Sequence, residues 1–251
     1  QDNGNWSGPA YTWKRGGIRT LYWQYLVGGD GFDISPDLDN SRFGYGSSQN
    51  GNLYRYDKLT GYYVKIQPPA PDTKTRLRFN WNAGFARDPF DDHKAYYGSQ
   101  FVHVTHDKGA TWEIISPDLT TNNPEHQKPD YGGLTLDVSG AEMYNSILTI
   151  APSPIDKNTI WAGTDDGQVQ LTTDGGKTWK NITEQIAGMP REGWIAQIEA
   201  SRYDAGTAWM VVNNYRKGDY KPYLFKTEDF GKKWSRKADE NKVKGYALTV
   251  I

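Results

Sequence analysis

Short runs of alternating apolar and polar residues dominate the chain, and turn residues separate one run from the next. Alternation with period two over four to seven residues is typical of half-buried β-strands, and Gly, Asp and Pro between such runs indicate tight turns. No stretch carries the longer period of an amphipathic helix. The pattern therefore predicts an all-β protein built from short strands.

One phrase recurs along the chain and gives the period of an internal repeat. The pattern T-x-D-x-G-x-T-W occupies residues 105–112 and again 172–179, and residues 227–234 match it except that Lys233 replaces the second Thr. A degenerate copy with one extra residue occupies 55–63. The steps between the acidic residues of successive copies are 50, 67 and 55 residues, as given by the positions of Asp57, Asp107, Asp174 and Asp229.

The segments upstream of each phrase repeat as well. Residues 150–152, for example, form an apolar run that leads through Asp156 to the aromatic run 161–164, and residues 34–36 lead through Asp39 to 45–47 in the same way. Each unit thus contains four short strands, which is the composition of one β-propeller blade. Because such a unit buries its faces only against its neighbours, tandem copies are expected to stack around a common axis.

The predicted fold is a β-propeller of four-stranded antiparallel blades, and the chain is expected to be an incomplete part of a larger propeller. Residues 18–66, 67–116, 117–183 and 184–237 are the predicted blades, with 1–17 as the end of a preceding blade and 238–251 as the start of a further one. In the alternative, the two end segments pair with each other and close a small propeller of five blades.

The recurring phrase is predicted to be the hairpin between the third and fourth strands of each blade. Its Asp can accept hydrogen bonds from the backbone of its own turn, its Gly can adopt a positive φ, and its Trp can fill the space between blades. The residues with this structural role are Asp107, Gly109, Trp112, Asp174, Gly176, Trp179, Asp229, Gly231 and Trp234.

The phrase resembles the Asp-box, or BNR repeat, of sialidases, two-propeller xyloglucanases and the sortilin/Vps10 propeller. Residues 28–32, 78–82 and 115–120 resemble segments of the sortilin-type and glycosyl-hydrolase-like BNR proteins of Bacteroidetes, and the likeness covers essentially the whole chain. The resemblance implies a propeller that is secreted or displayed at the cell surface, in the bacterial periplasm or exterior. It implies no particular reaction.

Composition and charge remove several function classes. With 29 Lys and Arg against 30 Asp and Glu, the chain lacks the basic excess of a nucleic-acid-binding protein or a polybasic membrane binder. No apolar run approaches the roughly 20 residues of a membrane span. The absence of cysteine excludes disulfides and thiolate metal sites. His103 and His106 point to opposite faces of a strand, so no metal or cofactor is predicted.

Ligands of propellers usually bind over the central channel, where loops lead into the inner strands. Three such segments carry an arginine followed by a tryptophan, and they are predicted to bind a ligand through charge and aromatic stacking. These residues are Arg19, Trp23, Arg78, Trp81, Arg191 and Trp194. In the alternative, the tryptophans pack between blades and the arginines stack on them or pair with nearby acids.

Acidic residues near the same face are Asp30, Asp33, Glu142 and Glu199, of which Asp30, Glu142 and Glu199 are the catalytic candidates. Glycoside hydrolysis needs two carboxyl groups about 5–9.5 Å apart. Acids at turns more often cap the turn or remain solvated. Asp165 and Asp166 are predicted to be turn residues, with calcium binding as the alternative.

Two functions remain open. The first is a non-catalytic scaffold that binds a protein, a peptide or a glycan, with the remaining blades of a parent propeller as further partners. The second is a sialidase- or xyloglucanase-like glycoside hydrolase that uses a carboxylate pair at the channel face. The separation of the acids in space distinguishes the two.

Overall fold

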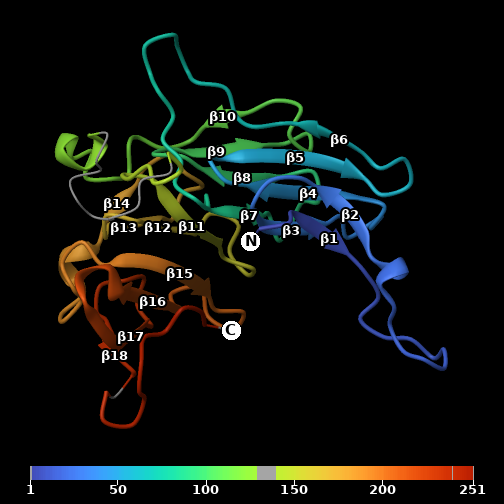
Figure 1. The fold of residues 1–251 in the computed structure, drawn as a ribbon. Helices are drawn as coiled ribbons and strands as arrows, with labels where there is room; N and C mark the ends of the chain where they lie inside the picture. Colours follow the sequence, from blue (N-terminus) through green and yellow to red (C-terminus); the bar gives the residue numbers. More distant parts are fainter. Residues whose placement is uncertain (1, 129–139, 239, 251) are drawn as a thin grey trace.

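The computed structural model describes residues 2–128, 140–238 and 240–250, and these residues form antiparallel β-sheets joined by turns and short 3-10 helices (Figure 1). A two-stranded sheet comes first in the chain, and four four-stranded sheets follow it. Within the described ranges, no helix combines the length and apolar character that crossing a membrane requires.

The two-stranded sheet pairs β1 (Asn5–Ser7) with β2 (Gln24–Val27). Blade 1 comprises β3 (Gly31–Pro36), β4 (Phe43–Ser48), β5 (Asn52–Asp57) and β6 (Tyr62–Lys65). Blade 2 comprises β7 (Phe85–Arg87), β8 (Ala95–Gly98), β9 (Val102–Thr105) and β10 (Glu113–Ile114). Blade 3 comprises β11 (Ile147–Pro152), β12 (Ile160–Thr164), β13 (Val169–Thr172) and β14 (Lys180–Asn181). Blade 4 comprises β15 (Trp194–Ala200), β16 (Ala208–Asn214), β17 (Asp219–Thr227) and β18 (Ser235–Arg236).

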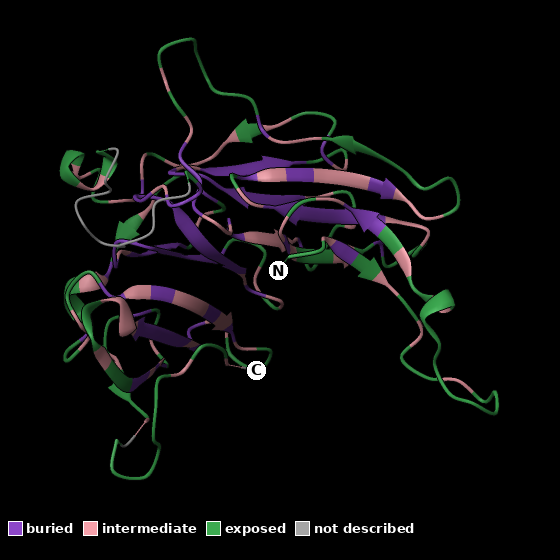
Figure 2. Cartoon of the chain, in the orientation of Figure 1, coloured by how far each residue is buried: buried purple, intermediate pink, exposed green. Residues whose placement is uncertain are grey.

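Buried residues are concentrated on the strands of the sheets (Figure 2), and the apolar ones among them pack where one sheet meets the next. Four separate clusters occupy the four junctions: Leu26 and Val27 meet Tyr56, and Tyr45 meets Tyr97. Further along, Val104 meets Ile150, and Trp161 meets Ile195 and Phe225. Successive sheets that bury only their facing surfaces are blades of a propeller. The predicted all-β propeller with four-stranded antiparallel blades is confirmed.

Small residues in the second strand of a blade allow this packing. A Cβ on Gly98 would lie 2.8 Å from Cβ of Ile147, in the next blade. A Cβ on Gly163 would lie 2.3 Å from Cγ2 of Ile195, again in the next blade. Since both distances are shorter than van der Waals contact, glycine at these positions sets how closely the inner strands approach.

The three close copies of the recurring phrase form hairpins between the third and fourth strands, which we call the acidic hairpins. In the second of them, Asp174 accepts hydrogen bonds from Thr172 Oγ1 at 2.8 Å, from the Thr178 amide at 2.9 Å and from Thr178 Oγ1 at 2.6 Å. Trp179 Nε1 then donates to the Ile115 carbonyl of the preceding blade at 2.8 Å. This hairpin therefore closes its own turn and also joins two blades.

The structure corrects two details of the predicted blade boundaries. Residues 24–27 form β2 and pair with β1, so the segment from residue 18 onwards belongs to the two-stranded sheet and blade 1 begins at β3. The described part of 238–251 contains no strand. There, the Val250 amide donates to Gln197 Oε1 at 3.0 Å, and the Thr249 hydroxyl bonds the same oxygen. Blades 2 to 4 lie within the ranges 67–116, 117–183 and 184–237.

Candidate functional site

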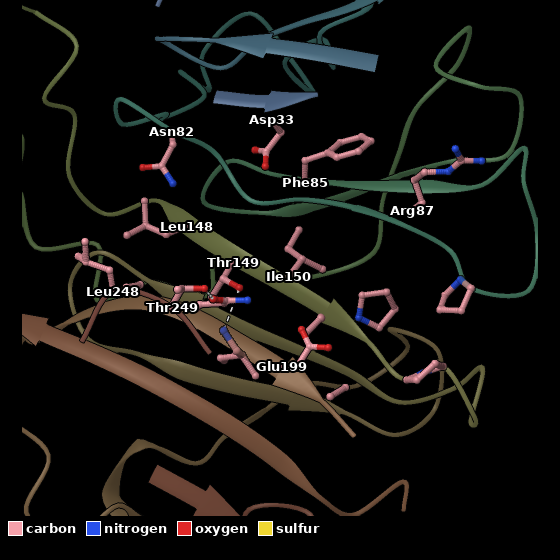
Figure 3. Close-up of a pocket in the computed structure, with 18 of the residues that line it drawn as sticks. Asp33, Asn82, Phe85, Arg87, Leu148, Thr149, Ile150, Glu199, Leu248 and Thr249 are labelled. Atoms are coloured by element: carbon pink, nitrogen blue, oxygen red, sulfur yellow. Dashed lines mark hydrogen bonds between the residues drawn. The ribbon is translucent and has the colours of Figure 1, made fainter. Parts of the chain in front are cut away.

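The first strand of every blade borders a central cavity of about 520 Å³ (Figure 3). Because β3, β7, β11 and β15 are the inner edges of their sheets, their side chains on one face point into this space. The lining combines acidic and amide side chains of β3 and β15 with apolar residues of β7 and β11. Arg87, Arg202 and the C-terminal residues Leu248 and Thr249 also contribute to it. Residues that matter below are Asp33, Asn82, Thr149, Gln197 and Glu199.

Two carboxylates, Asp33 of β3 and Glu199 of β15, lie on opposite walls of the cavity (Figure 3). Neither side chain has a hydrogen-bond or ion-pair partner among the described residues. The surrounding walls desolvate Asp33 and raise its pKa to about 6, although the side chain stays exposed to the cavity itself. Asp33 therefore keeps its proton to a higher pH than an ordinary aspartate does.

Alternation along β15 decides that Glu199 faces the cavity. Ile198 is 3 % exposed and packs in the apolar cluster between blades 3 and 4. Its neighbour Glu199 consequently points the other way, into the cavity, because successive side chains of a strand alternate between its two faces. The backbone amide of Ile198 donates to Thr149 Oγ1 at 3.2 Å, which holds β15 against β11.

The other two catalytic candidates lie outside this cavity. Glu142 accepts a hydrogen bond from the Gly140 amide at 3.0 Å, in its own turn, and another from Trp81 Nε1 at 3.0 Å. The pKa of Asp30 is raised by partial burial and then by a hydrogen bond to Asp2. The structure thus does not bring Asp30, Glu142 and Glu199 together, and the acid that faces Glu199 is Asp33.

The predicted arginine–tryptophan pairs differ in where the structure places them and in what they contact. Arg78 is 9 % exposed and acts as a structural link, because Nε donates to the Asn145 carbonyl at 2.9 Å and Nη2 pairs with Asp118 at 2.6 Å. Arg191 is exposed, and Trp194 stacks with a different arginine, described below. Both pairs lie on the surface formed by the loops that lead into β7, β11 and β15, which we call the loop face.

The placement of Arg19 and Trp23 before an inner strand is wrong. They flank the 3-10 helix η1 (Thr20–Tyr22) in the connection between β1 and β2, which projects from the molecule (Figure 1). Trp23 is 47 % exposed. The prediction failed because residues 24–27 pair with β1, so the segment before them is a hairpin loop and does not lead into the channel.

A buried acidic network lies beneath the loop face at Asp165 and Asp166, which the sequence predicts to be turn residues with calcium binding as the alternative. Asp165 accepts from Asn80 Nδ2 at 2.9 Å and from the Ser146 amide and hydroxyl at 2.9 and 2.8 Å. Asp166 accepts from the Thr121 amide at 2.8 Å and from Asn145 Nδ2 at 2.5 Å. Burial, with the charge of Asp166 second, raises the pKa of Asp165 to about 7.

This network ties together three loops that lie far apart in the sequence. All its carboxylate oxygens accept bonds from protein donors, so the geometry is that of a structural hub rather than of an open cation site. Over residues 2–128, 140–238 and 240–250, no three His, Asp or Glu side chains gather as metal ligands would. A signal in the sequence was the doublet Asp165–Asp166 in the turn after β12, but its partners could not be read from it.

An array of rings crosses the loop face above this hub. The Tyr144 ring lies 5.7 Å from the Trp194 ring and 6.1 Å from His126. The guanidinium of Arg216 lies 3.6 Å from the centre of the Trp194 ring and 4.5 Å from that of Tyr215. Burial raises the pKa of Tyr144 to about 12, although the charge of Arg216 opposes the shift.

Solved structures with this fold include glycoside hydrolases. An ancestral GH74 enzyme aligns with a TM-score of 0.53 at 18 % identity, covering 86 % of this chain and 25 % of that protein. The GH74 xyloglucanase from Xanthomonas campestris aligns with a TM-score of 0.54 at 17 % identity, covering 93 % of this chain and 32 % of the enzyme.

A third similar structure is the extracellular domain of a protein from B. thetaiotaomicron described as a hybrid two component system. It aligns with a TM-score of 0.51 at 11 % identity and covers 84 % of this chain and 25 % of that one. The chain therefore spans between a quarter and a third of the length of these propeller proteins. At such low identity the likeness shows the fold alone. No protein-family model and no curated protein sequence matches the chain.

Proposed function

We propose that this chain is part of a secreted or cell-surface propeller that binds a ligand over its central cavity, and that the ligand is a carbohydrate. The observation that carries the proposal is the separation of the predicted groups. The cavity that holds Asp33 and Glu199 has one aromatic side chain, Phe85, in its lining, whereas the array of Trp and Tyr rings lies on the loop face. Such an arrangement favours binding along a surface over catalysis at one point.

The chemistry of the cavity wall supports a carbohydrate ligand over the protein or peptide that the sequence leaves open. Asn82, Thr149, Gln197 and Thr249 supply amide and hydroxyl groups, which can donate to and accept from sugar hydroxyls. Two structures of similar fold are GH74 enzymes, one of them a xyloglucanase. Export to the periplasm or exterior is supported by the resemblance of the sequence to BNR proteins.

Calorimetry of the purified chain against a panel of oligosaccharides, with xyloglucan fragments included, tests this function. At least one should bind, and Asn82→Ala combined with Gln197→Ala should weaken its binding about tenfold, because two hydrogen bonds are worth roughly 1–3 kcal/mol. Asn158→Ala, an exposed asparagine on the opposite face, is the control. Unchanged affinity in the double variant, or no binding to any member of the panel, would refute the proposal.

One observation favours glycoside hydrolysis as a second candidate function: Asp33 and Glu199 oppose each other across the cavity, and the pKa of Asp33 is raised to about 6. A carboxyl group that keeps its proton can protonate a glycosidic oxygen while an ionised partner acts as nucleophile or base. Here Asp33 would be the acid and Glu199 the partner, and activity would fall above about pH 6 as Asp33 ionises.

Release of reducing sugar from the same panel tests this second candidate. Asp33→Asn and Glu199→Gln should each lower the rate at least a hundredfold, consistent with the loss of a general acid or its partner. Asp30→Asn, which lies just before β3 but outside the cavity, is the matched control and should keep the activity. Wild-type rates in both cavity variants would show that this acid pair catalyses nothing.

A further inference from the structure

Arg216, in the 3-10 helix η5 (Tyr215–Lys217), is a cation with no ion-pair partner among the residues that the structure describes. Its guanidinium lies 3.6 Å from the Trp194 ring centre, and its Nη1 is buried without any hydrogen-bond acceptor. The other guanidinium nitrogens form no hydrogen bond with a described residue either. An ionic donor group that is partly desolvated and unpaired is costly, so its presence needs an explanation.

Arg216 differs in this respect from the other arginines of the described chain that are not exposed. Arg42 pairs with Asp57 at 2.6 Å, Arg55 with Asp37 at 2.7 Å and Arg78 with Asp118 at 2.6 Å. Arg87 donates to the Pro36 carbonyl and to Asp92, at 2.6 and 3.0 Å. Every one of these has a carboxylate partner, and Arg216 alone among them has none.

The acid that contacts the adjacent Lys217 and the acid three residues after Arg216 are both occupied by other groups. Glu192 pairs with Lys217 at 2.7 Å. Asp219 accepts from the Tyr223 hydroxyl at 2.6 Å and from Asn214 at 3.1 Å. A carboxylate from outside the chain therefore meets a guanidinium that has no competing partner within residues 2–128, 140–238 and 240–250, and the fork of N–H groups suits that anion in a bidentate pair.

Aromatic rings beside Arg216 fix the orientation of its guanidinium plane, and further rings continue the stacking surface to solvent. Tyr215 lies 5.1 Å from Tyr246, and Tyr246 lies 6.3 Å from Tyr220. Tyr220 and Tyr246 are 59 % and 41 % exposed. Exposed tyrosines offer a flat apolar face together with a hydroxyl group, which matches the face and the edge of a sugar ring.

We propose that Trp194, Tyr215, Arg216, Tyr220 and Tyr246 form a subsite for the uronate residue of an acidic oligosaccharide. Arg216 binds the carboxylate in a bidentate pair, and the exposed tyrosines stack on the sugar ring. Trp194 is a positioning residue, since it holds the guanidinium flat and so reduces the entropy lost when the ligand binds. The inference rests on the proposed carbohydrate function and specifies the class of sugar.

Calorimetry with trigalacturonate and with its methyl-esterified form tests the subsite, because the ester keeps the rings and removes the charge. Wild-type chain should bind the acid at least tenfold more tightly than the ester, and the preference should weaken as salt rises. Arg216→Gln should abolish the preference, and Arg216→Lys should retain only part of it. Arg15→Gln, an exposed arginine on the β1–β2 connection, should keep it in full.

Melting curves of each variant exclude loss of fold, and Arg216→Lys remains informative if Arg216→Gln is unstable. Equal affinity for acid and ester, or a preference that survives in Arg216→Gln, would overturn the subsite while leaving the carbohydrate function in place. Binding of neutral xyloglucan fragments without any binding of trigalacturonate would have the same meaning. If no sugar binds at all, the carbohydrate function fails and the subsite fails with it.

Discussion

At the scale of single residues, burial changes the acid–base behaviour of Asp165 more than its charged neighbour does. Its side chain is 1 % exposed, and desolvation is the larger cause of its raised pKa, with the charge of Asp166 second. Hydrogen bonds from Asn80 and Ser146 favour the ionised form and limit the shift, so that the pKa reaches about 7. The proton on this carboxyl group is therefore linked to folding.

Replacement of Asp165 by Asn should flatten the dependence of stability on pH. The folded chain keeps this proton up to about pH 7, whereas an unfolded aspartate loses it near pH 3.9. Since the folded state binds more protons between those values, the stabilisation is complete below about pH 4 and is lost as pH rises to about 7, by up to about 1.4 kcal/mol per unit.

Urea unfolding of wild type and Asp165→Asn between pH 5 and 8 measures this effect. The free energy of unfolding of the variant should gain on that of wild type as pH rises. Asp174→Asn is the matched control: hydrogen bonds from Thr178 hold the pKa of Asp174 at about 2, so its titration lies below this range. Parallel curves for wild type and Asp165→Asn would contradict the expectation.

At the scale of elements, the acidic hairpins of blades 2 and 3 each connect their blade to the preceding one through a hydrogen bond. The carboxylate orders the turn, and the indole then donates across the junction, at 2.7 Å from Trp112 to the Ile66 carbonyl and at 2.8 Å from Trp179 to that of Ile115. In the third hairpin, Trp234 Nε1 is buried and has no acceptor in the part of the chain that the structure describes. The Trp234 ring lies 6.1 Å from that of Trp161.

This difference predicts unequal effects of the same substitution. Trp179→Phe should lower the free energy of unfolding by about 1 kcal/mol more than Trp234→Phe, because it alone breaks a hydrogen bond and leaves a carbonyl unpaired. Both changes lose similar apolar area, so the pair isolates the contribution of the bond. Denaturant titration of the two variants gives the measurement, and equal losses would show that the indole bond adds nothing to stability.

At the scale of the whole molecule, the inner and middle strands of each blade are expected to be more stable than the outer strands. The middle strands β12 and β16 have hydrogen-bonded strands on both sides and are almost wholly buried. Outer strands such as β14 and β18 are two residues long and exposed. Because each blade buries its faces only against its neighbours, local opening is expected to start at the outer strands.

Hydrogen exchange followed by mass spectrometry should therefore show a gradient within every blade. Amides of β12 and β16 should exchange most slowly, and peptides that cover β14, β18 and the β1–β2 connection should exchange within the shortest labelling times. Uniform protection across inner and outer strands would mean that the blades open only as complete units.

What the sequence by itself determined is local. The acidic hairpins could be predicted because Asp174 finds its donors within four residues, and the blades could be predicted because period-two alternation and turn residues set each strand. These features depend on the backbone and on residues close together in the sequence, so a short stretch of residues is enough to predict them.

Only the tertiary structure decided which distant groups meet. The sequence pattern of residues 24–27 indicates a strand but does not say which strand it pairs with. Because these residues pair with β1, Arg19 and Trp23 lie in the β1–β2 connection, away from the channel. Asp33 faces Glu199 because blades 1 and 4 turn their inner strands toward one cavity. Arg216 stands over Trp194 through the fold of blade 4. Such contacts depend on the angles between blades, which no spacing along the chain encodes.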